Sequence, residues 1–157
     1  MRLRLCAIAC VSCLLSTASL WAGQDEELIE KTIRAAVTGA ATFSESRDRQ
    51  TLLQLYANDY EGIQDGQGET RDAIEKWFAE YEGELKQGST LRFIGSVSNL
   101  RLHVNGGQAW GTYDYVFQAV RHGQLEGQDA GKCTSLLRKE ASAWLIVHEH
   151  CSKPRTP

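Results

Sequence analysis

Two histidines near the carboxyl end of the chain, His148 and His150, are well suited to carry chemistry. They stand two positions apart, and in a strand this spacing places both side chains on one face. Because an imidazole changes its charge near neutral pH, His148 is a candidate proton carrier in a cavity. The pair can also ligate zinc or copper with a third ligand from His103, His122 or Asp114. No signature spacing supports such a site, so we expect no metal.

Asp65 is a second candidate proton carrier, and it begins the short segment DGQG. A carboxylate that faces an apolar cavity holds its proton more tightly and can transfer it beside a carbonyl group. The alternative is that Asp65 only turns the chain beside Gly66, because glycine supplies the positive φ that turns need.

Cys133 and Cys151 can form a disulfide only in one register of the hairpin that joins them. If Glu140 opposes Ala143, Cys133 faces His150 and the two cysteines lie on opposite faces, which excludes a bridge. A nucleophilic pair of Cys133 and His150 is then an alternative. If the loop is one residue longer, the cysteines share a face as diagonal neighbours and a bridge is possible. The pattern leaves both registers open.

Aromatic residues supply candidates for binding a small molecule. Strand alternation places Tyr113 and Tyr115 on one face and Asp114 on the other. Trp77 and Tyr81 lie at helical spacing, and such a stripe is more often core than ligand site. Phenol hydroxyls in an apolar pocket orient a ligand by hydrogen bonds. We therefore predict that a small apolar or aromatic molecule is bound by Tyr60, Trp77, Tyr81, Tyr113, Tyr115, His148 and His150.

The elements that must position these residues begin with helices. Apolar residues three and four apart predict a helix over 25–44 and a shorter one over 48–56. A strand is expected at 60–64. Thr70 is a suitable N-cap for a third helix, whose apolar stripe extends to Leu85.

After Gly88 the apolar period changes to two, which is typical of strands. Gly95 is interpreted as a bulge, and residues 122–131 as a polar loop. The chain is therefore predicted to be one α+β domain, with N-terminal helices packed on a curved antiparallel sheet. The expected strands of that sheet cover residues 91–104, 108–120, 133–139 and 144–151.

The first residues of the chain have the layout of a secretory signal peptide. Arg2 and Arg4 precede an uncharged apolar run that ends near Leu20, which is short for a membrane helix of roughly 20 residues. We expect residues 1–22 to be removed and residues 23–157 to form a single secreted or periplasmic domain with no membrane span. In such an oxidising compartment a cysteine pair can be bridged.

Composition excludes two classes of protein. The chain has 157 residues, 42% of them hydrophobic, and a formal net charge of −3, which argues against a disordered chain. A pI near 5.8 offers no basic surface for nucleic acid, so no nucleic-acid partner is expected.

Three segments resemble the nuclear transport factor 2-like superfamily, which includes SnoaL-like and ketosteroid-isomerase-like domains. They are residues 55–60, residues 63–66 and residues 144–152. The last of them, WLIVHEHCS, is similar to the final strand of the association domain of calcium/calmodulin-dependent protein kinase II. The resemblance implies a cystatin-like cone with a cavity between the concave sheet and the helices, and a homodimer formed through the sheets.

The same resemblance leaves two functions open. It places Asp65 where ketosteroid isomerase keeps its general base, but Ala40 and Ser135 stand near the positions of that family's oxyanion donors. We therefore expect a homodimeric binding or association module with a small-molecule cavity and no cofactor. The alternative is an isomerase, dehydratase or cyclase that uses Asp65 and His148 as proton carriers.

Overall fold

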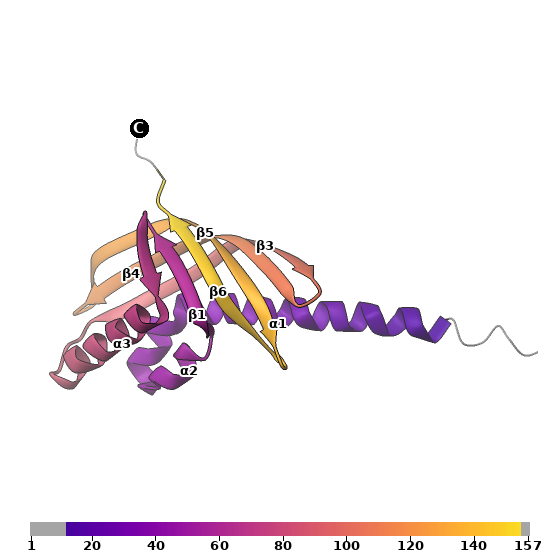
Figure 1. Cartoon of the computed structure of the whole chain (residues 1–157). Helices are drawn as coiled ribbons and strands as arrows, with labels where there is room; N and C mark the ends of the chain where they lie inside the picture. Colours follow the sequence, from indigo (N-terminus) through magenta and orange to yellow (C-terminus); the bar gives the residue numbers. More distant parts are fainter. Residues whose placement is uncertain (1–11, 155–157) are drawn as a thin grey trace, which may run out of the picture.

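Helices pack against one face of a curved six-stranded sheet in the computed structural model, which describes residues 12–154 (Figure 1). The helices are α1 (Ser12–Ser46), α2 (Arg49–Leu53) and α3 (Arg71–Lys86). The strands are β1 (Tyr56–Gln64), β2 (Gln67–Thr70), β3 (Arg92–Asn105), β4 (Gln108–Arg121), β5 (Gln124–Glu140) and β6 (Ala143–Ser152). The predicted α+β architecture is confirmed.

The sheet has the strand order β2-β1-β6-β5-β4-β3. Its neighbours are antiparallel except for β1 and β6, which run parallel. The expectation of a purely antiparallel sheet is therefore wrong at this pair. β1 and β6 are joined by residues 65–142 rather than by a hairpin turn, and a long connection permits parallel pairing.

Helix α1 begins before the predicted start at residue 25 and passes beneath the sheet, with its N-terminal turns extending beyond it (Figure 1). It therefore includes residues 12–22 of the predicted signal peptide, whereas residues 1–11 lie outside the described part of the chain. Removal of this segment stays a prediction. Within residues 12–154, no helix is long and apolar enough to span a membrane.

The two shorter helices begin at capped residues. The Asp48 carboxylate accepts a hydrogen bond from the backbone N–H of Thr51 at 3.1 Å, and Thr70 Oγ1 accepts one from Ala73 at 3.3 Å. Both bonds satisfy N–H groups that have no partner inside a helix. The predicted cap at Thr70 is confirmed.

The segment predicted as a loop at 122–131 is mostly strand. Only His122 and Gly123 form the turn, both with positive φ, and β5 starts at Gln124. Residues 124–128 are exposed, and because neither face of this part of the strand is buried, the sequence shows no alternation of apolar and polar residues. The ladder of backbone hydrogen bonds to β4 holds them extended.

Gly95 is not a bulge, because it pairs in register with Phe117. The irregularity in β3 lies between Ser98 and Arg101 instead. A Cβ at Gly95 would meet the carbonyl oxygen of Val37 on α1. Glycine is therefore needed here because the helix backbone approaches the strand closely.

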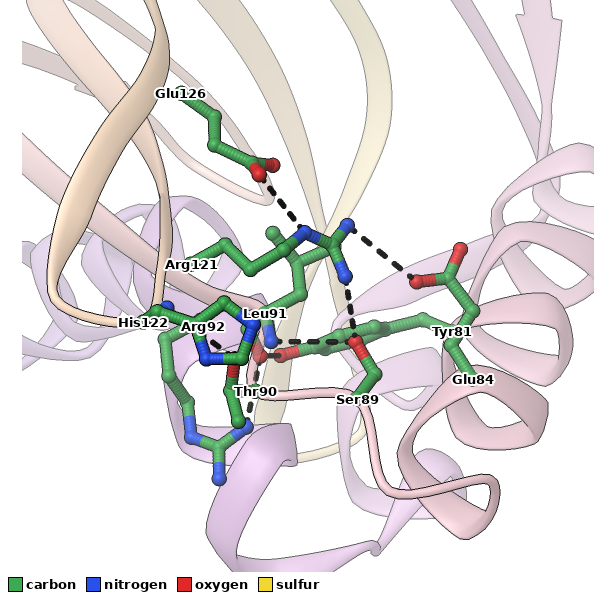
Figure 2. A network of polar contacts seen from close by, with 9 residues as sticks. All are labelled: Tyr81, Glu84, Ser89, Thr90, Leu91, Arg92, Arg121, His122 and Glu126. Atoms are coloured by element: carbon green, nitrogen blue, oxygen red, sulfur yellow. Dashed lines mark hydrogen bonds and ion pairs between the residues drawn. The ribbon is translucent and has the colours of Figure 1, made fainter.

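A polar network ties the β4–β5 hairpin to the loop between α3 and β3 (Figure 2). Arg121 lies between Glu84 and Glu126, at 4.0 Å and 2.9 Å, and donates to Ser89 Oγ at 3.0 Å. Beside it, the Tyr81 hydroxyl donates to the carbonyl oxygen of Leu91 at 2.9 Å. These contacts hold α3 against the end of the sheet.

The β5–β6 hairpin combines two registers. Glu140 opposes Ala143, as in the first predicted register, but an irregularity between Leu136 and Leu137 shifts the pairing by one residue. Cys133 and Cys151 are consequently direct partners, with their Cα atoms 4.1 Å apart, and they form a disulfide. Neither predicted register holds along the whole hairpin, because β6 contains one extra residue.

Candidate functional site

A cavity of about 410 Å³ lies between the concave face of the sheet and helices α1 and α3. Its apolar wall comes mainly from α1 and α3, and its polar residues come from the sheet. The lining residues are Ala36, Val37, Ala40, Tyr56, Gln64, Glu69, Ile74, Trp77, Phe78, Tyr113, Tyr115, Phe117, Asp129, Cys133, Glu149 and Cys151.

The extra residue in β6 decides which side chains enter this cavity. Ile146 is fully buried and pairs with Leu137, and strict alternation would point His148 to the same face. The shift pairs His148 with Leu136 and Glu149 with the buried Ser135. Glu149 therefore lines the cavity, and His148 lies on the outer face of the sheet.

Glu149 is held by hydrogen bonds at the inner end of the cavity. Its Oε1 atom accepts from Ser135 Oγ at 2.6 Å and from the Tyr113 hydroxyl at 3.1 Å. The two hydroxyl oxygens of Ser135 and Tyr113 are themselves 3.0 Å apart. Both donors stand on neighbouring strands, so the sheet fixes the direction of the carboxyl group.

Tyr60 links Glu149 to a second carboxyl group, that of Glu69 on β2. The phenol oxygen of Tyr60 lies 3.3 Å from Glu69 Oε2 and 3.5 Å from Glu149 Oε2. A phenol has one proton, so it can donate to only one carboxylate at a time. The inner end of the cavity therefore has more hydrogen-bond acceptors than donors.

The pKa values at this end of the cavity are raised. Burial raises the pKa of Glu149 above its ordinary value, and the charge of Glu69 adds to this effect. Burial likewise raises the pKa of Glu69. Burial and the charge of Glu149 raise the pKa of Tyr60 and Tyr113, so both phenols remain protonated donors.

A second polar group lies at another edge of the cavity. The Gln64 amide donates to the Tyr115 hydroxyl at 3.2 Å, and this hydroxyl donates to Asp129 Oδ1 at 3.4 Å. Lys153 Nζ lies 3.2 Å from Asp129 and 3.0 Å from Asp65, so the two carboxylates share one cation. This edge therefore contains a cation, unlike the end that holds Glu149.

Asp65 is exposed in the turn between β1 and β2 and is not a lining residue of the cavity. Its carboxylate accepts a hydrogen bond from the backbone N–H of Lys153 at 3.0 Å and forms an ion pair with its Nζ at 3.0 Å. The hydrogen bonds from Lys153 lower the pKa of Asp65. The structure thus places it in a turn, and a role as proton carrier stays a prediction.

His148 and His150 share one face, as the spacing predicts, but it is the outer face of the sheet. Cys133 does not face His150, which pairs with Thr134 instead. His103 stacks on Trp110 with ring centroids 5.0 Å apart. Among residues 23–154, no group of three or more His, Cys, Asp or Glu side chains could hold a metal ion.

The aromatic candidates divide into three groups. Trp77, Tyr113 and Tyr115 line the cavity. Tyr60 is buried and directs its hydroxyl at the two carboxyl groups. Tyr81 is buried against the loop before β3 and does not line the cavity. Their roles in binding a ligand stay predictions.

The sequence pattern did not single out the three acidic residues of the cavity lining, Glu69, Asp129 and Glu149. Glu149 lies between two histidines, and its side chain points inward because of the irregularity in β6. No residue type in this segment predicts that irregularity. The available signal was a single acidic residue in a final strand whose first half, residues 143–147, is apolar.

Comparison with known proteins supports the architecture. The family model described as SnoaL-like domain matches residues 33–156. None of the curated proteins matches the chain.

Solved structures of the same fold are similar over most of this chain. A nuclear transport factor 2-like protein with a cystatin-like fold from Novosphingobium aromaticivorans has a TM-score of 0.65 and 17% identity, covering 92% of this chain and 90% of its own. A protein from the same organism assigned as a scytalone dehydratase has a TM-score of 0.63 and 15% identity, covering 83% and 85%.

A third solved structure has the same fold. It is a Xanthomonas campestris protein assigned as a calcium/calmodulin-dependent protein kinase II association domain, with a TM-score of 0.56 and 18% identity, covering 83% and 86%. At these identities the structures establish the fold alone, and the predicted cystatin-like cone is confirmed.

Proposed function

This chain belongs to the SnoaL-like domain family, and we propose that its cavity binds a small, mainly apolar molecule that presents a polar group to Glu149. The family includes isomerases, dehydratases and binding modules. The fold therefore leaves the choice to the residues of the cavity.

The observation that carries the proposal is the composition of the cavity wall. Trp77, Phe78 and Phe117 give it aromatic surface, and Glu149 with its hydrogen-bonded neighbours stands at one end. A cavity of about 410 Å³ lies within the range of small-molecule sites, which are mostly apolar with a few convergent polar groups.

The proposal includes export and a homodimer. Export is supported by the arginines and apolar run before residue 23, and by the disulfide between Cys133 and Cys151. A dimer is supported by apolar side chains on the outer face of the sheet, where Trp110 and Leu136 are each 40% exposed.

The test starts with native mass spectrometry of the exported protein purified gently from its own compartment. We expect a dimer with excess mass that disappears on denaturation, and an N-terminus close to residue 23.

Binding of Nile red, a neutral apolar dye, then tests whether the cavity takes up a small apolar molecule. The substitution Ala36→Phe places a larger side chain in the cavity and should reduce dye uptake at least tenfold.

The matched control is Ala79→Phe, which makes the same change at an exposed position of α3. It should bind the dye as the original protein does. Equal dye binding by both variants, together with no excess mass, would contradict a binding function for the cavity.

A second function, proton-transfer catalysis, is favoured by the raised pKa of Glu149 in the cavity. A protonated Glu149 can transfer its proton to a bound carbonyl oxygen, and Tyr113 and Ser135 hold its carboxyl group in place. The test incubates the compound found by mass spectrometry with the protein. Turnover should be lost in Glu149→Gln, whereas loss in Asp65→Asn or His148→Gln would favour the sequence-based alternative.

A further inference from the structure

We propose that the molecule bound in this cavity carries a cationic amine, and that its ammonium group binds between Glu149 and Glu69. This inference rests on the proposed function and names the chemical class of its ligand. Three observations carry it: the charge of the cavity, its balance of hydrogen-bond donors and acceptors, and its aromatic surface.

The cavity is acidic. Its lining contains Glu69, Asp129 and Glu149 but no Lys, Arg or His. Asp129 is paired with Lys153, whereas Glu69 and Glu149 form no ion pair with the side chains of residues 23–154. Two neighbouring carboxyl groups without a cation repel each other when both are ionised. An ammonium group supplies the missing positive charge, and an anionic ligand would add to the repulsion.

The donor and acceptor balance also favours an ammonium group. Ser135 and Tyr113 donate to Glu149 Oε1. When both carboxyl groups are ionised, Glu149 Oε2 and Glu69 Oε2 share only the single proton of Tyr60. The hydroxyl of Tyr56, which also lines the cavity, forms no hydrogen bond within residues 23–154. An ammonium group has three N–H donors and no acceptor, so it matches this end of the cavity.

The walls suit the rest of such a molecule. Trp77, Phe78 and Phe117 can cover an apolar or aromatic body. Two tyrosines lie near the carboxyl groups: Tyr113 donates to Glu149, and the ring of Tyr56 packs against that of Tyr60. Aromatic faces attract cations, and the attraction increases when water is excluded. The cavity therefore has an apolar part and a site for a cation. These two parts complement the aromatic ring and the ammonium group of an arylalkyl amine.

The test compares three compounds that share an indole and differ in charge: tryptamine, tryptophol and indole-3-acetate. Each is titrated calorimetrically into the purified full-length mature protein near neutral pH. We expect tryptamine to bind at least tenfold more tightly than tryptophol, and indole-3-acetate to bind more weakly than either.

Variants then assign the preference to the two carboxyl groups. Glu149→Gln and Glu69→Gln should each reduce tryptamine affinity at least tenfold and leave tryptophol affinity within about threefold. Glu61→Gln is the matched control, because Glu61 is exposed on β1 at the outer face of the sheet, opposite His148. It should leave the binding of all three compounds unchanged.

The outcomes separate this inference from the proposed function. Equal binding of tryptophol and tryptamine, or a preference that survives both cavity variants, overturns the amine and leaves a neutral-ligand cavity. If none of the three compounds binds, the amine is also overturned. Nile red uptake then tests separately whether the cavity binds a small apolar molecule. Circular dichroism checks the fold of each variant. If Glu149→Gln does not fold, Glu69→Gln and the ligand series of the original protein decide.

Discussion

Glu149 and His148 are adjacent residues with opposite environments, and the difference arises from one irregular position in β6. Glu149 lies among Ser135, Tyr113 and Tyr60, where burial raises the pKa of its carboxyl group. His148 lies on the outer face, opposite Leu136. A buried carboxyl group without a cation costs stability, and proteins retain such groups mainly where they serve a site.

At the residue scale, this cost predicts a pH dependence. The pKa of Glu149 is higher in the folded than in the unfolded protein, so the folded state binds more protons and the free energy of unfolding falls as pH rises above the ordinary value near 4.5. Glu149→Gln should remove this loss. Urea unfolding at about pH 4 and about pH 7 should therefore show the variant gaining stability relative to the original protein as pH rises.

The same measurement on Glu61→Gln serves as the control, since Glu61 is exposed. A stability difference between Glu149→Gln and the original protein that is the same at both pH values would show that burial of this carboxyl group has no linked cost.

At the element scale, the cavity depends on how closely α1 approaches the sheet. The carbonyl oxygen of Val37 lies against Gly95, and Val37, Ala36 and Ala40 on the same helix line the cavity. Phe93 stacks on Phe117 beside this contact, with ring centroids 5.0 Å apart. A change that moves the helix away from β3 should therefore alter both stability and ligand binding.

Gly95→Ala should destabilise the protein by about 2 kcal/mol or more, because the added methyl group meets backbone that cannot move as a side chain does. Urea unfolding measures the change. Gly107→Ala is the matched control, since a Cβ there has no neighbour within 4 Å, and it should change stability by less than about 0.5 kcal/mol. Equal effects of the two substitutions would show that α1 does not constrain position 95.

At the scale of the whole molecule, the disulfide joins two strands that both line the cavity. Cys133 and Cys151 are 18 residues apart in sequence. Cys133 precedes Ser135 by two positions on β5, and Cys151 follows Glu149 by two positions on β6. The bridge therefore fixes the pairing of β5 and β6 next to the carboxyl site. It closes the chain into a loop that the unfolded state must also retain.

Replacing both cysteines by serine should lower the free energy of unfolding by about 3 kcal/mol, as expected for a loop of this length. Reductant should destabilise the original protein by a similar amount and leave the double serine variant unchanged. Two free thiols per chain in the purified exported protein would contradict the bridge.

The sequence by itself determined the larger part of the architecture. Helical spacing, the Thr70 cap and the change of period after Gly88 predicted the helices and most strands, because these signals depend on neighbours within a few residues. The resemblance of residues 144–152 to a known final strand identified the fold. The polar end of the β4–β5 hairpin was missed, since a strand exposed on both faces has no apolar alternation.

Only the tertiary structure decided which side chains meet in the cavity. The choice between Glu149 and His148 depends on one extra residue in β6, and a shift of one residue exchanges the two faces of a strand. The same shift brought Cys133 and Cys151 together. Glu149 and Glu69 both reach Tyr60 because β1 lies between β6 and β2. This arrangement brings together segments that are distant in sequence, so local residue spacing does not encode it.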